Sequence, residues 1–306
     1  MKRLTLMAAL ACLVAMPALA QKGPRPAPEA DPVLGVTLDE FSDTGPNSLD
    51  FMGAQARIEA RANNDTTTTP IFIIETNGAE VLRFEGEPSF YSFLPVSLRI
   101  ANIDGASDLP EVIATSYTGG AHCCERVQIA AQQPDGSWAV HELGLFDGGY
   151  GLVDADEDGF AEIEVADQSF LYTFDCYACS APPPRFYEIV EGAPIDASGN
   201  PDLYTYFEAE LARLEDPATM LDQPGRLAGW AGLVARLGRG EAAISQLTQL
   251  NAAPDAFYEG CVGGGSMWEC ADENKVQMDF IAFLRNHLID HGYIDEGRST
   301  QPGGKG

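Results

Sequence analysis

The sharpest chemical pattern in this chain is Asp154-Ala155-Asp156-Glu157-Asp158-Gly159-Phe160-Ala161-Glu162-Ile163. Its carboxylates stand at alternate positions of a tight turn, and Gly159 permits the backbone conformation that such a turn needs. Oxygens spaced in this way converge on one point, which suits Ca²⁺ with its roughly 6–8 oxygen ligands. The pattern therefore predicts a calcium site. The alternative is a solvated acidic turn without an ion.

The expected calcium ligands are the side chains of Asp154, Asp156, Asp158 and Glu162 and the backbone carbonyl of Phe160. Carboxylates crowded into so short a loop repel one another and raise one another's pKa unless a cation lies between them. Ca²⁺ is accordingly the expected cofactor, in a structural role.

The residues after this loop predict a strand and not a helix. An EF-hand loop carries a glutamate at its twelfth position, where this chain has Val165. Residues 162–166 alternate between two kinds of side chain, as in a half-buried strand. A calcium loop that enters a strand resembles the loop of FG-GAP/VCBS repeats, which occur in integrin α-chains and in many bacterial secreted proteins. The resemblance implies β-repeats that bind calcium and an adhesion-like binding role.

A degenerate copy of the acidic loop lies earlier in the chain. Its candidate ligands are Asn102, Asp104, Asp108 and Glu111, with one residue inserted between Asp104 and Glu111. In both copies a strand, a tyrosine, a cysteine pair and a further strand follow the loop. This similarity predicts an internal repeat of antiparallel β-units, and the resemblance to FG-GAP/VCBS repeats covers roughly residues 95–195.

The fold class expected from these patterns is α+β, with more than one domain. Residues 34–196 predict a β-rich repeat domain, in which the strand-like runs 71–75 and 81–84 flank the hairpin turn Asn77-Gly78. A complete propeller uses about 4–8 blades. The β-rich region is therefore expected to be a partial or small propeller-like sheet array, or a β-sandwich.

Residues 197–295 predict a small α-helical domain. Helices are expected from the capping residue Asn200, over 225–237, over 241–250, and from Asp272 to Gly292. The tail at 296–306 is expected to be disordered.

The N-terminal residues 1–20 combine a basic start, a short apolar run and an Ala-x-Ala end. This pattern is typical of a secretory signal peptide, cleaved here after Ala20. A lipoprotein site at Cys12 is the alternative, although the apolar run continues past that cysteine. Residues 21–33 are rich in proline and are expected to form an extended leader. No later stretch is apolar and long enough to cross a membrane, so a periplasmic or secreted location is expected.

The formal net charge of −28 limits the classes of partner. Nucleic acids and anionic membranes bind through basic side chains, so the charge argues against both. It suits solubility and the binding of cations. An acidic proteome or a saline habitat would also explain it.

Six cysteines follow the signal peptide, and an even number in an exported protein predicts disulfides. They are Cys123, Cys124, Cys176, Cys179, Cys261 and Cys270. The first four are expected to form two disulfides that join equivalent loops of the repeat, with their pairing left open. Zinc binding with His122 and a redox pair are the alternatives, and the proline run after Cys179 argues against the redox pair. The last two are expected to pair locally.

Two further features are candidates for binding. His287 and His291 lie four residues apart on an expected helix, a spacing that suits a shared metal, but the sequence shows no third ligand. The alternative is that both are favoured near a helix C-terminus by its dipole. The loop from Tyr117 to His122 has a polar tip that suits a ligand, and its alternative role is a turn that holds the cysteines.

The function expected from these observations is binding to a protein or glycan partner, through loops that calcium orders. An enzyme is the second hypothesis, a hydrolase of an envelope polymer whose catalytic residues the sequence does not identify. A deep pocket with two carboxylates, or a histidine beside a nucleophile, would favour that hypothesis. A structural envelope protein is the third.

Overall fold

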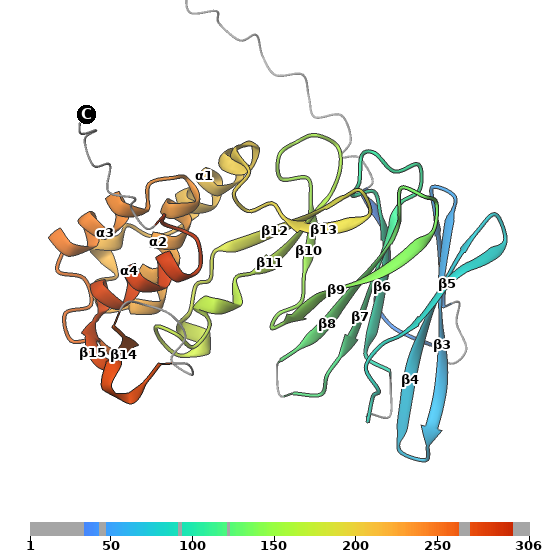
Figure 1. Ribbon diagram of the computed structural model, residues 1–306, viewed down its shortest axis with the longest axis horizontal. Helices are drawn as coiled ribbons and strands as arrows, with labels where there is room; N and C mark the ends of the chain where they lie inside the picture. The colour runs from blue at the N-terminus through green and yellow to red at the C-terminus, as the bar shows by residue number, and fades with distance from the viewer. Residues whose placement is uncertain (1–33, 43–46, 91–93, 121–122, 263–269, 296–306) are drawn as a thin grey trace, which may run out of the picture. The chain divides into compact units, whose positions relative to one another are not determined.

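The computed structural model describes residues 34–42, 47–90, 94–120, 123–262 and 270–295, and Figure 1 shows their arrangement. The expected signal peptide, leader and C-terminal tail, as well as His122, lie outside these ranges. From Leu34 onward the chain forms one compact unit.

The strands of this unit pair in antiparallel sheets. Their bounds are β1 (Gly35–Leu38), β2 (Ser48–Phe51), β3 (Ala54–Asn64), β4 (Thr67–Thr76), β5 (Ala79–Glu85), β6 (Val96–Ala101), β7 (Glu111–Tyr117), β8 (Glu125–Gln132), β9 (Trp138–Phe146), β10 (Gly151–Val153), β11 (Glu162–Ala166), β12 (Pro184–Val190), β13 (Ala193–Asp196), β14 (Phe257–Cys261) and β15 (Lys275–Asp279).

Three sheets are formed by the part of the chain that is coloured from blue to yellow in Figure 1. The first has the order β2-β3-β4-β5, the second β1-β6-β7-β8-β9 and the third β10-β11-β12-β13. The hairpin predicted at Asn77-Gly78 joins β4 to β5. In the described part of the chain the sheets do not close into a barrel. The α+β fold class, with a β-rich part before a helical part, is confirmed.

The second sheet is covered on both faces, which explains the apolar runs of its central strands. Successive side chains of a strand point to opposite faces, and those of β7 divide accordingly. Val112 packs with Phe72 of the first sheet, whereas Ile113 packs with Ile163 of the third sheet. The alternating side chains of β7 thus contribute to two apolar layers, one between the first and second sheets and one between the second and third sheets. The second of these layers contains side chains of β11, the strand that follows the acidic loop.

The helical part packs against the third sheet and against the segment that follows β11. Its helices are α1 (Tyr204–Arg213), α2 (Pro224–Arg236), α3 (Gly240–Gln249) and α4 (Phe280–Asp290). Phe170 and Phe174 enter the core of these helices beside Leu227 and Leu284. Phe186 of β12 packs with residues of α1 and α2 in a separate cluster. The boundary predicted after residue 196 follows the end of β13, and independent folding on either side of it stays a prediction.

The helix predicted from Asp272 to Gly292 is shorter than expected. A short 3-10 turn, η5 (Asp272–Asn274), and strand β15 occupy its first part, and α4 begins at Phe280. The Asp279 carboxylate caps α4 by accepting a 2.8 Å hydrogen bond from the Ala282 amide. The physical reason is long-range pairing, because β15 lies antiparallel to β14 and this pairing overrides the local helical preference.

Candidate metal centre

The acidic loop lies between β10 and β11, and its own side chains shape its turn. The amides of Asp158 and Gly159 donate to carboxylate oxygens of Asp156 and Asp154, both at 3.1 Å. The Phe160 amide donates to the Asp158 Oδ1 at 2.8 Å. Gly159 has a φ of +94°, a conformation that glycine adopts readily. Such side-chain-to-backbone bonds explain why this sequence folds into a loop at this position.

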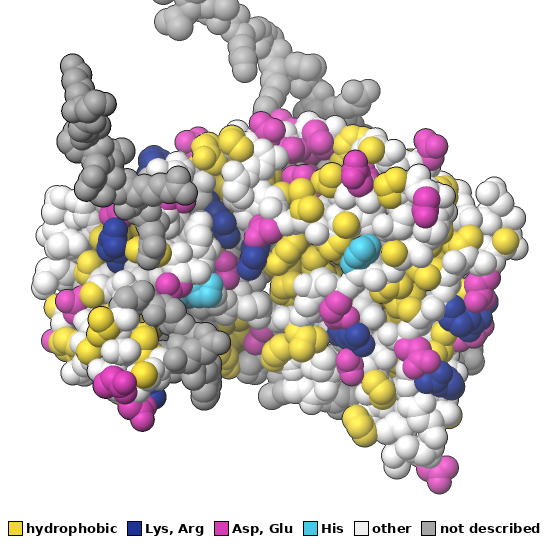
Figure 2. Space-filling view, in the orientation of Figure 1, with side chains coloured by type: hydrophobic (Ala, Val, Ile, Leu, Met, Phe, Trp, Pro, Cys, Tyr) yellow, Lys and Arg dark blue, Asp and Glu magenta, His cyan; other side chains and the backbone are white. Residues whose placement is uncertain are grey.

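Three of the predicted ligands come together. One carboxylate oxygen from each of Asp154, Asp156 and Glu162 lies within 4.8 Å of the others. Acidic side chains gather near the top of the face drawn in Figure 2, in the place of the loop above β10 in Figure 1. Oxygens at this spacing can share a single cation.

Two of these carboxylates are held in surroundings that suit an ion. Glu162 is 2% exposed, and its Oε2 accepts a 2.5 Å hydrogen bond from the Ala155 amide. The Oδ1 atom of Asp154 is buried and has no hydrogen-bond partner. Buried polar atoms without a partner are rare because the loss of water is not compensated. A hard cation would supply the missing interaction, so the residues present fit Ca²⁺.

The electrostatics of the loop agree with this fit. Burial raises the pKa of Glu162 to about 7, and repulsion from Asp156, Asp158 and Asp154 adds to the effect. Burial also raises the pKa of Asp156, followed by repulsion from Asp158. A bound cation would reverse both effects by stabilising the ionised carboxylates.

The other two predicted ligands take part differently. The Asp158 carboxylate is not in the group of three, and it accepts the hydrogen bond from Phe160. The Phe160 ring packs against the earlier acidic loop, where a Cβ atom added at Gly105 would lie 2.9 Å from it. The Ala161 amide donates to the Asn102 carbonyl at 2.9 Å. The two predicted loops are therefore neighbours in space.

The earlier loop uses its carboxylates to hold its own backbone. Glu111 is 1% exposed and accepts hydrogen bonds from the amides of Ile103 and Asp104 at 2.9 and 3.1 Å. The oxygens of Asp104 accept from the amides of Ala106 and Gly192 at 2.9 and 3.4 Å. Burial raises the pKa of Glu111 to about 7. Glu111 and Glu162 therefore have the same structural role. Each is a buried glutamate at the start of a strand, and its carboxylate accepts hydrogen bonds from backbone amides of the preceding loop.

The four predicted ligands of the earlier loop do not form a group of carboxylates in the described part of the chain. Asp108 is exposed, and the oxygens of Asp104 are already bonded to amides. An ion at this loop stays a prediction.

The cysteines pair within their own loops. Cys176 bonds to Cys179, with Cα atoms 5.0 Å apart, and Cys123 bonds to its neighbour Cys124. The expectation that disulfides join the two repeats is therefore wrong. Each of these cysteines bonds to another cysteine of its own loop, one or three residues away. The local disulfide expected between Cys261 and Cys270 is confirmed.

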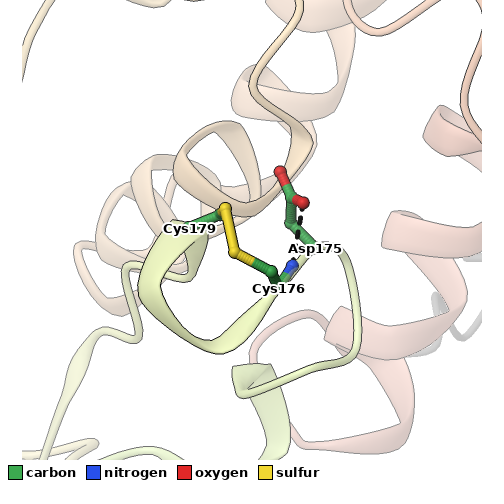
Figure 3. Close-up of side chains that lie close together, drawn as sticks. All are labelled: Asp175, Cys176 and Cys179. Atoms are coloured by element: carbon green, nitrogen blue, oxygen red, sulfur yellow. Dashed lines mark hydrogen bonds between the residues drawn. A yellow bond between two sulfur atoms is a disulfide. The ribbon is translucent and has the colours of Figure 1, made fainter.

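A second group of potential ligands, Asp175, Cys176 and Cys179, is shown in Figure 3. The Asp175 carboxylate accepts a 2.8 Å hydrogen bond from the Cys176 amide, and the two sulfur atoms are joined in a disulfide. Zinc binds thiolates, and a disulfide offers none. The disulfide interpretation of these cysteines holds, and this group is not a zinc site.

His287 is a buried histidine in a core of aromatic rings. Its ring centre lies 4.7 Å from that of Phe170 and 5.0 Å from that of Phe174. Burial lowers its pKa to about 3, and the nearby His291 adds to the effect. The two histidines do not belong to any group of three potential ligands in the described part of the chain. This arrangement fits a neutral core histidine better than a metal ligand.

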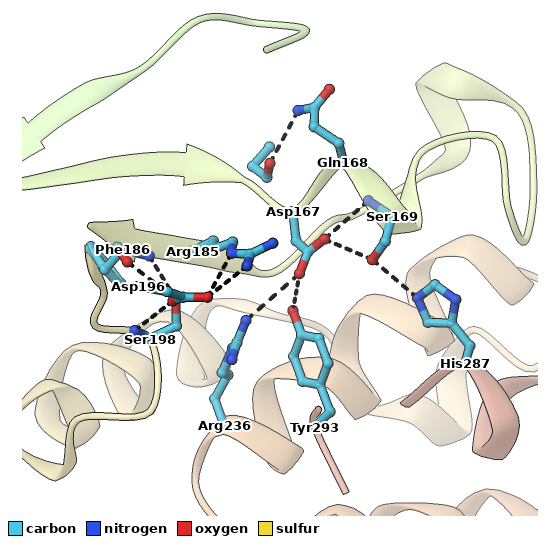
Figure 4. A network of polar contacts seen from close by, with 11 residues as sticks. Asp167, Gln168, Ser169, Arg185, Phe186, Asp196, Ser198, Arg236, His287 and Tyr293 are labelled. Carbon is cyan, nitrogen blue, oxygen red and sulfur yellow. Dashed lines mark hydrogen bonds and ion pairs between the residues drawn. The ribbon is translucent and has the colours of Figure 1, made fainter. Parts of the chain in front are cut away.

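A polar network that the sequence analysis did not find surrounds Asp167 (Figure 4). Its carboxylate accepts hydrogen bonds from the hydroxyls of Ser169 and Tyr293, both at 2.7 Å, and Arg236 lies 3.7 Å away. The Ser169 hydroxyl is also 3.3 Å from the Nε2 atom of His287. The sequence carries one local signal, the spacing Asp-x-Ser that caps the short helix η1 (Gln168–Phe170).

This network contains a serine, a histidine and an aspartate, but not in the order that activates a nucleophile. In a catalytic triad the aspartate binds the histidine, and the histidine accepts the serine proton. Here Asp167 itself accepts the Ser169 hydroxyl, and His287 has a strongly lowered pKa. The network joins the end of β11 to α2, α4 and Tyr293, so its visible role is to hold these elements together.

Comparison with known proteins finds relatives with little described function. The chain is 28% identical over 211 residues to a protein of Synechocystis sp. named a "probable thylakoid lumen protein", covering 66% of this chain and 62% of the relative. It is 27% identical over 273 residues to an uncharacterised protein of Sinorhizobium fredii, covering 86% of this chain and 43% of the relative. The chain thus spans less than two thirds of either relative. No family model and no solved structure matches.

None of the helices in the described part of the chain combines the length and the apolar character needed to span a membrane.

Proposed function

We propose that this protein is an exported calcium-binding β-repeat protein, which acts as a binding module for a protein or glycan partner. The observation that carries the proposal is the group of Asp154, Asp156 and Glu162, with its buried Asp154 oxygen that lacks a hydrogen-bond partner. Ca²⁺ would complete the coordination of this oxygen and would link β10 to β11. Because β11 packs into the layer between the second and third sheets, calcium would order the surface loops around that layer.

Two observations support export. Three disulfides within one chain are typical of proteins that fold in an oxidising compartment. The name of the Synechocystis relative places that protein in the thylakoid lumen. The proposal includes a periplasmic or secreted location and cleavage of the signal peptide after Ala20.

Thermal unfolding of the oxidised mature protein tests the calcium site. Binding to the folded state alone stabilises a protein by about 2.7 kcal/mol when calcium is present at about 100 times its dissociation constant. For a chain of this size such a stabilisation raises the melting temperature by about 5 °C. The measurement compares millimolar calcium with a chelator.

Two matched variants make the test specific to the loop. Asp156→Asn removes a ligand charge and keeps the oxygen that accepts from the Asp158 amide, so we expect it to abolish the calcium response. Glu208→Gln removes one charge from an exposed position on α1 and should leave the response unchanged. Equal melting temperatures of the wild type with calcium and with chelator would refute the proposal.

A further inference from the structure

A cavity of about 670 Å³ lies on the second sheet, away from both acidic loops. The earlier acidic loop connects the end of β6 to the start of β7. The cavity is at the opposite end of these strands, where Ser97 pairs in register with Thr115. Its volume is within the range of about 300–1,000 Å³ that small-molecule sites occupy.

The alternation of the strands explains why this region is polar. On the face that packs against the third sheet, β6, β7 and β8 present Ala101, Ile113 and Val127 to an apolar layer. Two residues from each of these positions, in the direction of the cavity, the same face carries Arg99 on β6, Thr115 on β7 and Glu125 on β8. Because they line the cavity, the apolar layer ends there and a polar site begins.

Two buried polar atoms in the wall of this cavity have no hydrogen-bond partner. They are the Nε atom of Arg99 and the hydroxyl of Tyr150. The guanidinium carbon of Arg99 lies 4.9 Å from the centre of the Tyr150 ring. Burial raises the pKa of Tyr150, while the charge of Arg99 and the nearby Ser97 hydroxyl oppose this increase. The contact with Ser97 does not give the Tyr150 hydroxyl a hydrogen bond of regular geometry. Because the two side chains are in contact and both residues line the cavity, an acceptor from outside the chain would satisfy donors that the described residues leave without a partner.

The opposite charge lies across the same cavity. Glu125, Asp39 and Glu40 are among its lining residues. Burial raises the pKa of Glu125, and Arg99 lowers it, so the two charges interact. No salt bridge joins Arg99 to any acid in the part of the chain that the structure describes. The Glu125 carboxylate lies against Gly149, where an added Cβ atom would be 2.6 Å from its Oε2.

We propose that this cavity binds a small zwitterion of the α-amino-acid type. Its carboxylate would accept from Arg99 and the Tyr150 hydroxyl, and its ammonium group would lie against Glu125 and Asp39. A simple anion would meet the acids of the wall without compensation, and a simple cation would leave Arg99 and Tyr150 without a partner. A molecule with both charges satisfies both sides, and charge-assisted bonds are the strong ones. The proposal does not depend on calcium, because no predicted calcium ligand lines the cavity.

Calorimetric titration of the oxidised mature protein tests this inference. The probes are the 20 standard L-amino acids, one at a time, with sodium acetate, methylammonium chloride and D-glucose as controls. We expect at least one amino acid to bind saturably below about 10 mM, and acetate and methylammonium to bind at least tenfold more weakly. Saturable binding of glucose alone would overturn the proposal in favour of a sugar site. The proposal would also be overturned if none of the 20 amino acids bound saturably.

Two variants assign the binding to this cavity. Tyr150→Phe removes only the hydroxyl and should weaken binding about tenfold, and Arg99→Gln should weaken it more. Arg61→Gln, at an exposed arginine on β3, is the matched control and should bind like the wild type. Unchanged affinity in folded Tyr150→Phe and Arg99→Gln would place the ligand elsewhere and refute the assignment. Asp156→Asn should bind the amino acid normally, so the loss of the calcium response and the loss of this binding are separate results.

Discussion

Replacing Glu162 by glutamine should stabilise the calcium-free protein at pH 8 and abolish its response to calcium. Glutamine keeps an oxygen to accept from the Ala155 amide, so the loop geometry is preserved while the charge is removed. In the wild type, burial raises the pKa of Glu162 from its ordinary 4.5 to about 7. The folded protein therefore holds a proton that the unfolded chain has released at neutral pH.

The sign and the size of the effect follow from this difference. Between pH 4.5 and 7 the folded state binds more protons than the unfolded state, so stability falls as pH rises. Once the pH exceeds the folded pKa, the full loss is about 3 kcal/mol. A neutral glutamine does not titrate, so Glu162→Gln should avoid this loss. Its gain over the wild type at pH 8, in chelator, should approach about 3 kcal/mol.

The same proton competes with calcium. A carboxylate must lose its proton to bind the ion, so calcium affinity should rise with pH. With a pKa of about 7, about one molecule in a hundred carries an ionised Glu162 at pH 5. We therefore expect calcium to bind about a hundredfold more weakly at pH 5 than at pH 8.

Calorimetry at pH 5, 6, 7 and 8 measures the calcium affinity, and urea unfolding in chelator measures the stability. Glu111→Gln is the matched control, because Glu111 is equally buried and also has a pKa of about 7. It should change the stability of the calcium-free protein with pH, and calcium binding should remain, because the group of Asp154, Asp156 and Glu162 is intact in this variant. A calcium affinity that does not vary between pH 5 and pH 8, or a Glu162→Gln protein less stable than the wild type at pH 8 in chelator, would refute this reasoning.

Two further predictions concern contacts between segments. Gly105→Ala places a methyl group 2.9 Å from the Phe160 ring, so it should lower the free energy of unfolding by about 1–3 kcal/mol in urea; Gly199→Ala, with no atom near the added carbon, is the control, and equal effects would contradict the contact. Tyr293→Phe removes the hydrogen bond to the buried Asp167 and should cost about 1.5–3 kcal/mol, also measured in urea. A cost below about 0.5 kcal/mol would show that the network around Asp167 does not hold the helices.

Much of the local structure was predictable because it depends on neighbours in sequence. The turn at Asn77-Gly78, the acidic loop and the first three helices all follow from turn chemistry, capping and periodicity. The local Cys261–Cys270 disulfide belongs to the same class, because a short loop brings its ends together at little entropic cost. These features form in the predicted places.

The errors arise where partners are distant in the chain. The segment Lys275–Asp279 was expected in a helix and is a strand, because a register with β14 decides its conformation. The cysteines expected to join the two repeats pair within their loops. A repeat in the sequence shows that two loops are alike, but it does not show whether their cysteines face each other.

That carboxylates of the acidic loop converge was predictable from the sequence, because a turn of a few residues brings its own side chains together; three of the four predicted carboxylates do so. The contacts of Asp167 with Tyr293 and of Arg99 with Tyr150 are seen only in the folded chain. Each of these pairs joins segments that are far apart along the chain. Apolar packing of the sheets and helices brings these side chains together. Because the hydrophobic effect is not directional, the apolar pattern in the sequence does not reveal which polar side chains will meet.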